Sequence, residues 1–434
     1  MPMPDLRHKE HTQDAVSDRE RLSAGRLAIT WMGFPFILAI TMTGSVLALT
    51  AGLRTAVLAT MVGSLAMFVY VGTLGEWGWR SGQSFAQIAQ GVYGRRGYRI
   101  VSGLLSTLVL GWFAINTAMP AEILASAYHI PYPVTAAVLG ILYVAITATG
   151  IVGLSRLSLS AVPVYAVLLV YGLAHLALRT AAGTPSAWPV PTMGFWPALS
   201  AVLAAFADSG TLAPDFNRWA KTRAASWIGS ACGFPLGFGL AMGAGELFTG
   251  FLRAAHASYL HPFQNGNPVG YLLAFGGLPA AFAVAVAVIN QGSNATHCLY
   301  NSTVGAAKLM SLRYRATALW LGLLGVALAA SGVWKYLLDW LQVIGFAVPP
   351  IGGALIARYR AVLKQDGAAE LADRTPYAPW IGTAVGWIAG GTILLTHSDA
   401  TAPLALVTFA AGFLATSILD ARTAARRQPQ PAKP

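Results

Sequence analysis

Twelve apolar segments, each long enough to cross a lipid bilayer, take up most of this 434-residue chain. A membrane-spanning helix needs about 20 mostly apolar residues. Charged residues make up only 10% of the sequence, whereas soluble domains carry about 25%. The sequence therefore predicts an all-α polytopic membrane protein with 12 transmembrane helices. The predicted spans are residues 27–50, 55–76, 99–127, 132–153, 159–179, 197–213, 225–251, 270–296, 316–332, 336–357, 378–395 and 401–420.

Positive charges are distributed unevenly between the two sides that these spans define. Only four of the 28 Lys and Arg residues fall on one side, and these are Arg54, Arg179, Arg253 and Lys335. Short basic loops stay on the cytoplasmic side, so both termini are expected to be cytoplasmic in a protein of the cytoplasmic (inner) membrane. This topology explains the net charge of +12 with membrane lipids, and no nucleic acid, as the expected neighbours.

The spans divide the chain into three regions. Residues 1–26 form a cytoplasmic N-terminal tail without the features of a secretory signal. Residues 27–420 form the transmembrane domain, and residues 421–434 form a basic cytoplasmic tail. The stretch from Arg422 to Pro434 is rich in Arg and Pro and is expected to lack regular structure. The longer loops, 180–196, 252–268 and 361–377, are too short to hold a soluble domain.

Three spans contain residues that interrupt a helix. The candidates are Pro35 in span 1, Ser209 and Gly210 in span 6, and Pro349 and Pro350 in span 10. Interrupted backbone persists inside a bilayer only where protein or a water-filled cavity surrounds it. Spans 1 and 6 cross the membrane in opposite directions, and broken helices at matching places of two inverted halves indicate a transport site.

Span 6 also carries an acidic residue, Asp208, beside its break. An ionisable residue inside a membrane is by default a candidate for function. The alternative interpretation is a packing kink in which Asp208 pairs with a neighbouring helix.

At these residues the chain resembles the cytosine permeases, or purine-cytosine permeases, of the nucleobase:cation symporter-1 family. The matching pieces keep their order along the chain and are Gly33 with Thr43-Gly44, Gly111-Trp112-Phe113, Ser209-Gly210-Thr211-Leu212 with Asp215-Phe216, Asn290 with Leu299-Tyr300, and Pro349-Pro350 with Gly352-Gly353. The resemblance implies a leucine-transporter-like five-plus-five inverted repeat with discontinuous helices 1 and 6 and two additional C-terminal helices. It also implies a symporter that takes up a nucleobase such as cytosine or a purine by secondary active transport.

The resemblance places Trp112 and Phe206 at two positions that sandwich a flat heterocycle. Stacking on an aromatic side chain is worth about 1–3 kcal/mol per base. Asn290 offers both a donor and an acceptor to the edge of a base. Asn116 lies one helical turn after Trp112, and Gly33 lies in the break of span 1. These five residues and Asp208 are the candidate substrate-binding residues.

Two positions depart from those permeases and put cytosine itself in doubt. Val109 stands where a base-binding Gln is typical, and Asp208 stands where a Ser is typical. An ionised carboxylate only accepts hydrogen bonds, so Asp208 favours a ligand with adjacent donors, such as the edge of guanine, or one that binds protonated. Because desolvation disfavours a buried charge, Asp208 is also a candidate proton carrier.

A sodium site is a further implication of the resemblance. Its candidate ligands are the carbonyl oxygens of Gly33, Phe36 and Asn290 and the side chains of Ser293 and Asn294. Asn294 replaces a hydroxyl with a longer amide, which weakens the analogy with sodium symporters. The sequence leaves the coupling ion open between H⁺ and Na⁺.

Alternative readings of the sequence concern the substrate and the class of protein. A hydroxymethylpyrimidine-type vitamin precursor and an allantoin- or hydantoin-like ureide are the alternative substrates. An enzyme needs a nucleophile–base pair or a metal cluster, which the sequence lacks at recognisable spacing, so neither an enzyme nor a cofactor is expected. A passive channel has no need for two inverted broken helices. Glu122 is a candidate for lining the outer vestibule, His297 is a candidate proton relay or a structural histidine, and the oligomeric state stays open.

Overall fold

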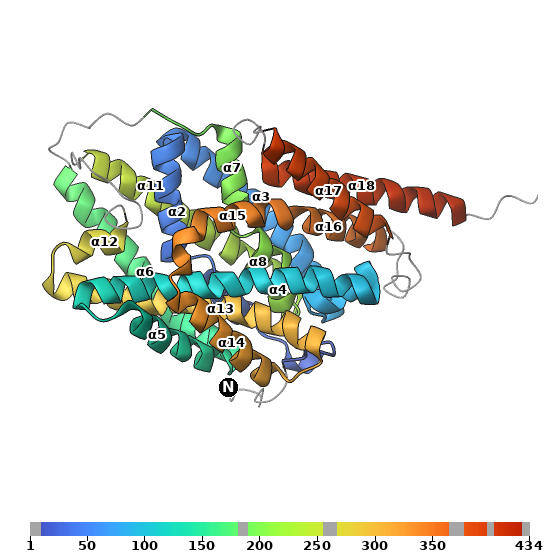
Figure 1. Ribbon diagram of the computed structural model, residues 1–434, viewed down its shortest axis with the longest axis horizontal. Helices are drawn as coiled ribbons and strands as arrows, with labels where there is room; N and C mark the ends of the chain where they lie inside the picture. Colours follow the sequence, from blue (N-terminus) through green and yellow to red (C-terminus); the bar gives the residue numbers. More distant parts are fainter. Residues whose placement is uncertain (1–9, 181–189, 255–266, 364–376, 397–402, 428–434) are drawn as a thin grey trace, which may run out of the picture.

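The computed structural model describes residues 10–180, 190–254, 267–363, 377–396 and 403–427. They form a helical bundle in which α4 runs beside α13 and α14 (Figure 1). Seven helical stretches of the described residues are long and apolar enough to cross a membrane, and two of these, Arg223–Arg253 and Asp339–Leu363, are made of consecutive shorter helices. The predictions for residues 1–9 and 428–434, and for most of the three longer loops, lie outside the described residues.

Each predicted span coincides with one helix or with consecutive shorter helices. The first five spans are formed by α1 (Ala24–Met32), α2 (Leu38–Ala51), α3 (Leu53–Ser81), α4 (Phe85–Tyr128), α5 (Tyr132–Thr147) and α6 (Ile151–Thr180). The next three are formed by α7 (Phe195–Ala204), α8 (Ala207–Thr211), α9 (Pro214–Asn217), α10 (Arg223–Ala231), the π-helical turn η2 (Cys232–Gly237), α11 (Phe238–Ala254), α12 (Pro268–Leu273) and α13 (Gly277–Met310). The last four are formed by α14 (Tyr314–Ala330), the 3₁₀ turn η3 (Val333–Tyr336), α15 (Leu337–Ala347), α16 (Pro349–Leu363), α17 (Tyr377–Leu395) and α18 (Leu404–Arg427).

Spans 1 and 10 are interrupted at the residues that the sequence indicates. Residues 33–37, which include Pro35, separate α1 from α2. Val348 separates α15 from α16, which begins at Pro349. Proline suits the first turn of a helix because its missing N–H needs no partner there.

The break of span 6 lies one turn earlier than expected. The chain leaves helical geometry at Phe206, with φ −141° and ψ 14°, and not at Ser209 and Gly210. These two residues belong to α8 because the Gly210 N–H donates to the Phe206 carbonyl at 2.7 Å and closes a helical turn directly after the break. Gly210 instead provides space, since a Cβ there would crowd Met67 and Tyr70 of α3.

Two glycines let α2 and α11 pack backbone against backbone. A Cβ on Gly44 would collide with the carbonyl of Met242, and a Cβ on Gly245 would collide with the carbonyl of Thr41. The hydroxyl of Ser45 donates to the Gly245 carbonyl at 3.1 Å. Small residues are the usual means of close helix packing in membranes, where lipid gives helices no hydrophobic reason to associate. This contact fixes the second half of span 1 against span 7.

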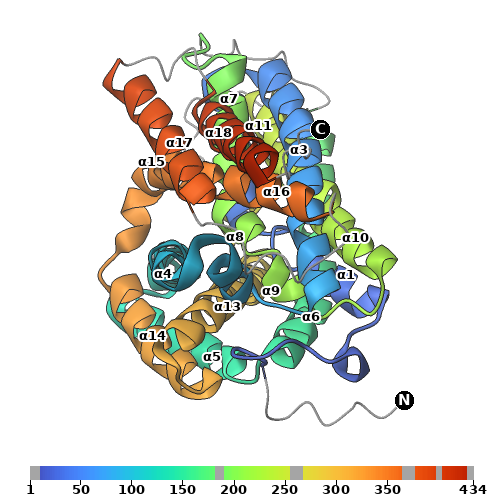
Figure 2. The ribbon, with the colours of Figure 1, turned by 90° about the vertical axis from the view of Figure 1, so that its right-hand side faces the viewer.

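The two C-terminal helices, α17 and α18, pack on α16 at the edge of the bundle (Figure 2). A buried ion pair anchors them, with Arg358 of α16 and Asp420 of α18 at 3.4 Å. The expectation that regular structure ends at Arg422 is wrong for residues 422–427, which continue α18. Ala and Arg are strong helix formers, and the anchored turn before them gives the helix a start from which to continue.

Candidate substrate site

A small buried cavity lies where the breaks of spans 1 and 6 face α4 and α13. Its volume is about 10 Å³. Side chains from both broken spans, from α4, from α13 and from α15 line it, and they are Ile37, Ala39, Ile40, Thr43, Trp112, Ala205, Phe206, Ser209, Asn294, Cys298 and Leu337. A heterocycle needs more room than this, so the structure represents a closed form in which the walls have come together.

Both predicted stacking residues line the cavity and are almost completely buried. Trp112 projects from the middle of α4, and Phe206 occupies the break of span 6 itself. Rings from three elements hold Phe206 edge-on, with centroid distances of 5.1 Å to Phe34, 5.4 Å to Phe234 and 5.7 Å to Phe238. The break thus presents an aromatic face whose orientation is fixed by packing rather than by the helix.

Asp208 lies directly behind the cavity wall and is fully buried. One carboxylate oxygen accepts the Ser209 N–H at 2.7 Å. The other oxygen has no hydrogen-bond partner among the described residues. The side chains of Ser209, Trp112, Tyr70 and Cys298 are polar groups that lie near the carboxylate. No lysine, arginine or histidine of the described chain forms an ion pair with it. Its contact with a neighbouring helix is with the side chain of Trp112 in α4.

Asn290 lies on α13 against the break of span 1, and the backbone of that break uses both ends of its carboxamide. Its oxygen accepts the Leu38 N–H at 2.9 Å, and its amide donates to the Phe36 carbonyl at 2.9 Å. Unpaired backbone groups inside a bilayer cost several kcal/mol each. Asn290 therefore satisfies two of the backbone groups that the break leaves without helical partners, and it is not among the residues that line the cavity.

Replacing Asn290 with alanine is expected to destabilise the folded protein by about 2–5 kcal/mol, because two buried backbone groups lose their partners. The measurement is the midpoint of thermal unfolding of the purified protein, together with its expression in the membrane. Asn301→Ala is the matched control, since Asn301 is a buried asparagine of the same helix whose carboxamide has no hydrogen-bond partner among the described residues. If Asn290→Ala unfolds at the wild-type temperature yet fails to bind substrate, the role of Asn290 is to hydrogen-bond to the edge of the base instead.

The predicted sodium ligands hydrogen-bond to one another. The Ser293 hydroxyl donates to the Gly33 carbonyl at 2.8 Å, and the Phe36 carbonyl accepts from Asn290. This contact leaves no space for a side chain at Gly33, because a Cβ there would meet the side chains of Ser158 and Ser293. Asn294 faces the cavity instead, and its amide oxygen accepts from the thiol of Cys298 at 3.4 Å.

Other polar residues of α13 hold neighbouring helices together. Gln291 is fully buried and donates to Asn116 of α4 at 3.3 Å. His297 bonds through Nδ1 to the Ser293 carbonyl at 2.6 Å and stacks on Phe34, with ring centroids 5.0 Å apart. Sequence reasoning missed Gln291 and Cys298. Cys298 lies one turn after Asn294, so helical spacing alone was the available signal.

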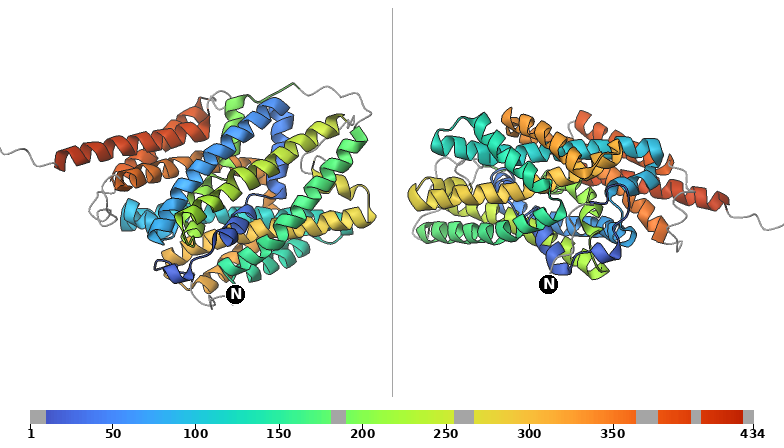
Figure 3. Two further views of the ribbon diagram at one scale, coloured as in Figure 1. Left: turned by 180° about the vertical axis from the view of Figure 1, so that it is seen from behind. Right: turned by 90° about the horizontal axis from the view of Figure 1, so that it is seen from below.

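The N-terminal segment, residues 10–22, covers one face of the bundle, which we call the N-terminal face (Figure 3). Arg218, which follows α9, is fully buried and donates to the backbone carbonyls of Glu10 and His11, each at 2.8 Å. The Glu10 carboxylate accepts from the Tyr300 hydroxyl at 2.9 Å and from the Ile151 N–H at 3.1 Å. These contacts tie the segment to spans 5, 6 and 8 at once.

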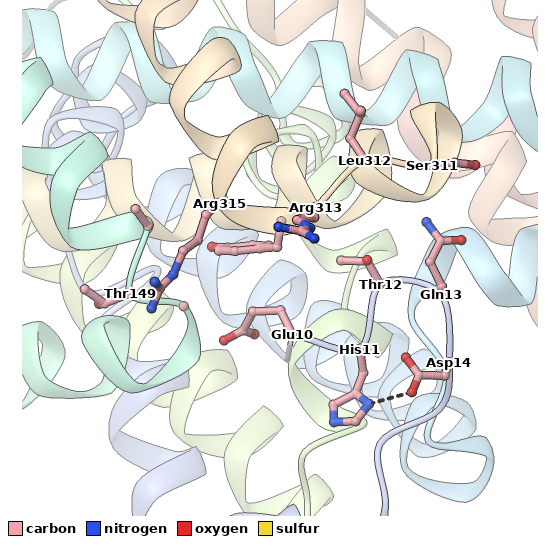
Figure 4. A pocket seen from close by; sticks show the side chains of 13 residues that line it. Glu10, His11, Thr12, Gln13, Asp14, Thr149, Ser311, Leu312, Arg313 and Arg315 are labelled. Carbon is pink, nitrogen blue, oxygen red and sulfur yellow. Dashed lines mark hydrogen bonds and ion pairs between the residues drawn. The ribbon is translucent and has the colours of Figure 1, made fainter. Parts of the chain in front are cut away.

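A pocket of about 630 Å³ opens beside this segment. Figure 4 shows residues 10–14 on one side of it and Arg313 and Arg315 on the other. Burial raises the pKa of the Glu10 carboxyl, and the attraction of Arg218 only partly offsets this effect. A carboxyl group whose pKa is higher when the segment is attached than when it is detached binds a proton more tightly in the attached state. Protonation therefore favours attachment as the pH falls through that pKa. Acidification therefore strengthens the attachment of the N-terminal segment.

On the opposite face, a pocket of about 650 Å³ lies between the ends of α4, α12 and α13. Glu122 lines it together with Asn267 and Trp334. The cavity that contains Trp112 is thus separated from both faces, and each face has a larger pocket of its own.

The chain is similar in sequence to known permeases. The family described as "Permease for cytosine/purines, uracil, thiamine, allantoin" matches residues 16–389. Over 353 residues the chain is 28% identical to the cytosine permease of Escherichia coli (strain K12) and 29% identical to that of Escherichia coli O157:H7, with 80% of each protein covered.

Solved structures share the fold at lower sequence identity. Mhp1, a nucleobase-cation-symport-1 family transporter in a closed conformation with bromovinylhydantoin bound, gives a TM-score of 0.75 at 19% identity, over 96% of this chain and 95% of Mhp1. A Na⁺-coupled sialic acid symporter gives a TM-score of 0.67 at 11% identity, over 96% and 92% of the two chains. The fold is therefore the five-plus-five transporter fold followed by two C-terminal helices. Because the family match includes both broken spans and the cavity between them, the chain belongs to the family of permeases for cytosine/purines, uracil, thiamine and allantoin.

Proposed function

We propose that this protein takes up a nucleobase, cytosine- or purine-like, across the cytoplasmic membrane by cation-coupled secondary active transport. The observation that carries the proposal is the buried cavity lined by Trp112 and Phe206 at the meeting point of two broken spans. Such breaks are where transporters of this kind bind their substrates. The cytosine permeases at 28–29% identity support a nucleobase as the solute, and two aromatic rings suit a flat heterocycle.

Substrate passes only if the two faces open in turn. The N-terminal face carries the basic loops and is, in this proposal, cytoplasmic, with both termini inside. Release of the substrate there requires the N-terminal segment to detach from Arg218 and Tyr300, which hold it across spans 6 and 8. Entry takes place from the opposite face, through the pocket that Glu122 lines.

The proton is the coupling ion in this proposal, and Asp208 carries it. Asp208 is fully buried, has one carboxylate oxygen without a partner among the described residues, and lies next to the cavity wall. Sodium at the alternative site has to displace the hydrogen bonds that the carbonyls of Gly33 and Phe36 accept from Ser293 and Asn290. Asp208 lies behind the wall, so it senses substrate through Trp112 and Ser209 rather than by direct contact in the closed form.

Arg218→Ala is expected to make the N-terminal face open more readily, because two carbonyls of the N-terminal segment lose their charged donor. Cys298 lines the cavity and is buried, so its thiol reports the opening. In a Cys232→Ser background, a maleimide applied from the cytoplasmic side should label Cys298 at least about fivefold faster in Arg218→Ala, the factor for about 1 kcal/mol.

The matched control is Arg313→Ala, which removes an exposed arginine beside the same pocket. The Arg313 side chain makes no hydrogen bond or ion pair among the described residues. It should label at the wild-type rate. Equal labelling of Arg218→Ala and wild type would show that the N-terminal segment does not control access to the cavity.

A thermal-shift screen of the purified protein tests the substrate. A ligand that binds the folded state raises its apparent stability. The panel contains cytosine, uracil, adenine, guanine, hydroxymethylpyrimidine, allantoin and hydantoin, each with and without sodium at acidic and neutral pH. Stabilisation by cytosine or a purine supports the proposal. Stabilisation by allantoin, hydantoin or hydroxymethylpyrimidine alone, or by none of the panel, overturns it.

A further inference from the structure

An apolar groove lies on the outside of the bundle, directly behind the break of span 6. Its volume is about 490 Å³, and helices α3, α16 and α18 form its walls. The side chains that line it are almost all apolar and include Met67, Leu203, Ile356, Phe409 and Phe413. Val69, which also lines it, is 58% exposed. In a membrane this side of the protein contacts lipid chains, so the natural occupant of the groove is apolar and comes from the bilayer.

One end of the groove carries a positive charge. Arg360 of α16 lines the groove, is exposed, and lies over the ring of Phe413 with 5.7 Å from the guanidinium carbon to the ring centroid. Arg360 lies near the end of α16 at Leu363, on the same face as the N-terminal segment. An arginine at this depth attracts anionic headgroups, and each such charge contributes about 1 kcal/mol to lipid binding.

The length of the groove matches one leaflet of the membrane. From Pro349 to Arg360 helix α16 rises about 16 Å, at about 1.5 Å per residue. One leaflet contributes about half of a hydrocarbon core of about 30 Å. An acyl chain whose headgroup meets Arg360 therefore reaches Pro349 at the other end.

The inner wall of the groove belongs to the substrate site. Ala207 lines the groove, whereas its neighbour Phe206 and nearby Ser209 line the substrate cavity. Tyr70 also lines the groove, and its hydroxyl is hydrogen-bonded to that of Thr211 in α8. One turn of broken helix is thus all that separates the two spaces. An occupant of the groove presses on the same turn that the substrate contacts from the other side.

We propose that this groove binds one acyl chain of an anionic phospholipid from the leaflet at the N-terminal face, with the phosphate on Arg360, and that the bound lipid holds the turn at Ala207 against the substrate cavity. The apolar wall of the groove binds the acyl chain, and the charge of Arg360 selects the headgroup. This site is distinct from the substrate cavity and does not depend on which solute or ion the protein carries.

Native mass spectrometry of the purified protein with phosphatidylglycerol and phosphatidylcholine tests the site. The wild type should retain phosphatidylglycerol in preference to phosphatidylcholine. Arg360→Gln should lower that preference about fivefold, the factor that corresponds to about 1 kcal/mol, while Arg99→Gln, at an exposed arginine of α4 away from the groove, should not. Ala66→Phe fills the groove from an exposed position and should reduce retention of both lipids, while Val62→Phe, one turn away on the lipid-facing surface, should not.

A functional measurement accompanies the binding assay. In liposomes that contain phosphatidylglycerol, Arg360→Gln and Ala66→Phe should both change the uptake rate, and in phosphatidylcholine alone Arg360→Gln should match the wild type. Undiminished phosphatidylglycerol preference in Arg360→Gln overturns the headgroup assignment. Wild-type lipid retention by Ala66→Phe overturns the groove as the site. A loss of dimers in Ala66→Phe without a loss of lipid assigns the groove to contact with a second copy of the chain.

Discussion

Replacing Trp112 with alanine is expected to abolish saturable uptake while the protein still reaches the membrane. Trp112 and Phe206 line the same cavity from two different elements, so loss of the indole removes one of the two aromatic surfaces. Stacking of about 1–3 kcal/mol corresponds to a roughly 5- to 150-fold weaker interaction. The measurement is the initial rate of radiolabelled nucleobase uptake against concentration. Trp112→Phe keeps a ring and should retain part of the activity.

The control for this substitution is Trp320→Ala. Trp320 lies on α14, is 72% exposed, and faces away from the cavity, so its loss should leave uptake unchanged. Near-normal uptake by Trp112→Ala at wild-type expression would remove the stacking assignment and with it the main argument for a flat heterocycle.

Replacing Asp208 with asparagine is expected to stop accumulation driven by a pH gradient while solute exchange at equal pH continues. The substitution keeps the size of the side chain and its acceptor for the Ser209 N–H, but it removes the group that takes up a proton. Uptake into proteoliposomes, with an imposed pH gradient and then without one, separates the two activities. Unchanged dependence on the pH gradient would show that Asp208 is not the proton carrier.

Glu246→Gln is a matched comparison, because Glu246 of α11 is another fully buried carboxylate. One oxygen of Glu246 accepts from the Thr60 hydroxyl at 2.6 Å, and the other has no partner among the described residues. Glu246 does not line the substrate cavity, so Glu246→Gln should keep pH-driven accumulation. If Glu246→Gln loses it and Asp208→Asn does not, the proton site lies between α3 and α11. If a sodium gradient instead drives uptake by both variants, sodium is the coupling ion.

Hydropathy and the positions of proline in the sequence determine much of this architecture. A bilayer requires about 20 apolar residues per crossing, and each of the twelve predicted spans coincides with helices in the structure. Pro35 and Pro349 indicate the breaks of spans 1 and 10 correctly, because proline has no N–H to donate to the helix before it. Trp112 and Phe206, which the sequence proposes as stacking residues, line one cavity, and their contact with a substrate stays a prediction.

Tertiary contacts decided what local signals left open. The break of span 6 falls at Phe206 and not at Gly210, because surrounding rings hold Phe206 in a non-helical conformation and Gly210 serves as a contact for α3. Asn290 has the donor and acceptor that a base edge needs, yet both serve the broken backbone of span 1. A sequence lists hydrogen-bonding groups but not their partners. Inside a membrane the unpaired backbone takes the nearest partners, and only the packing of spans 1 and 8 shows that Asn290 supplies them.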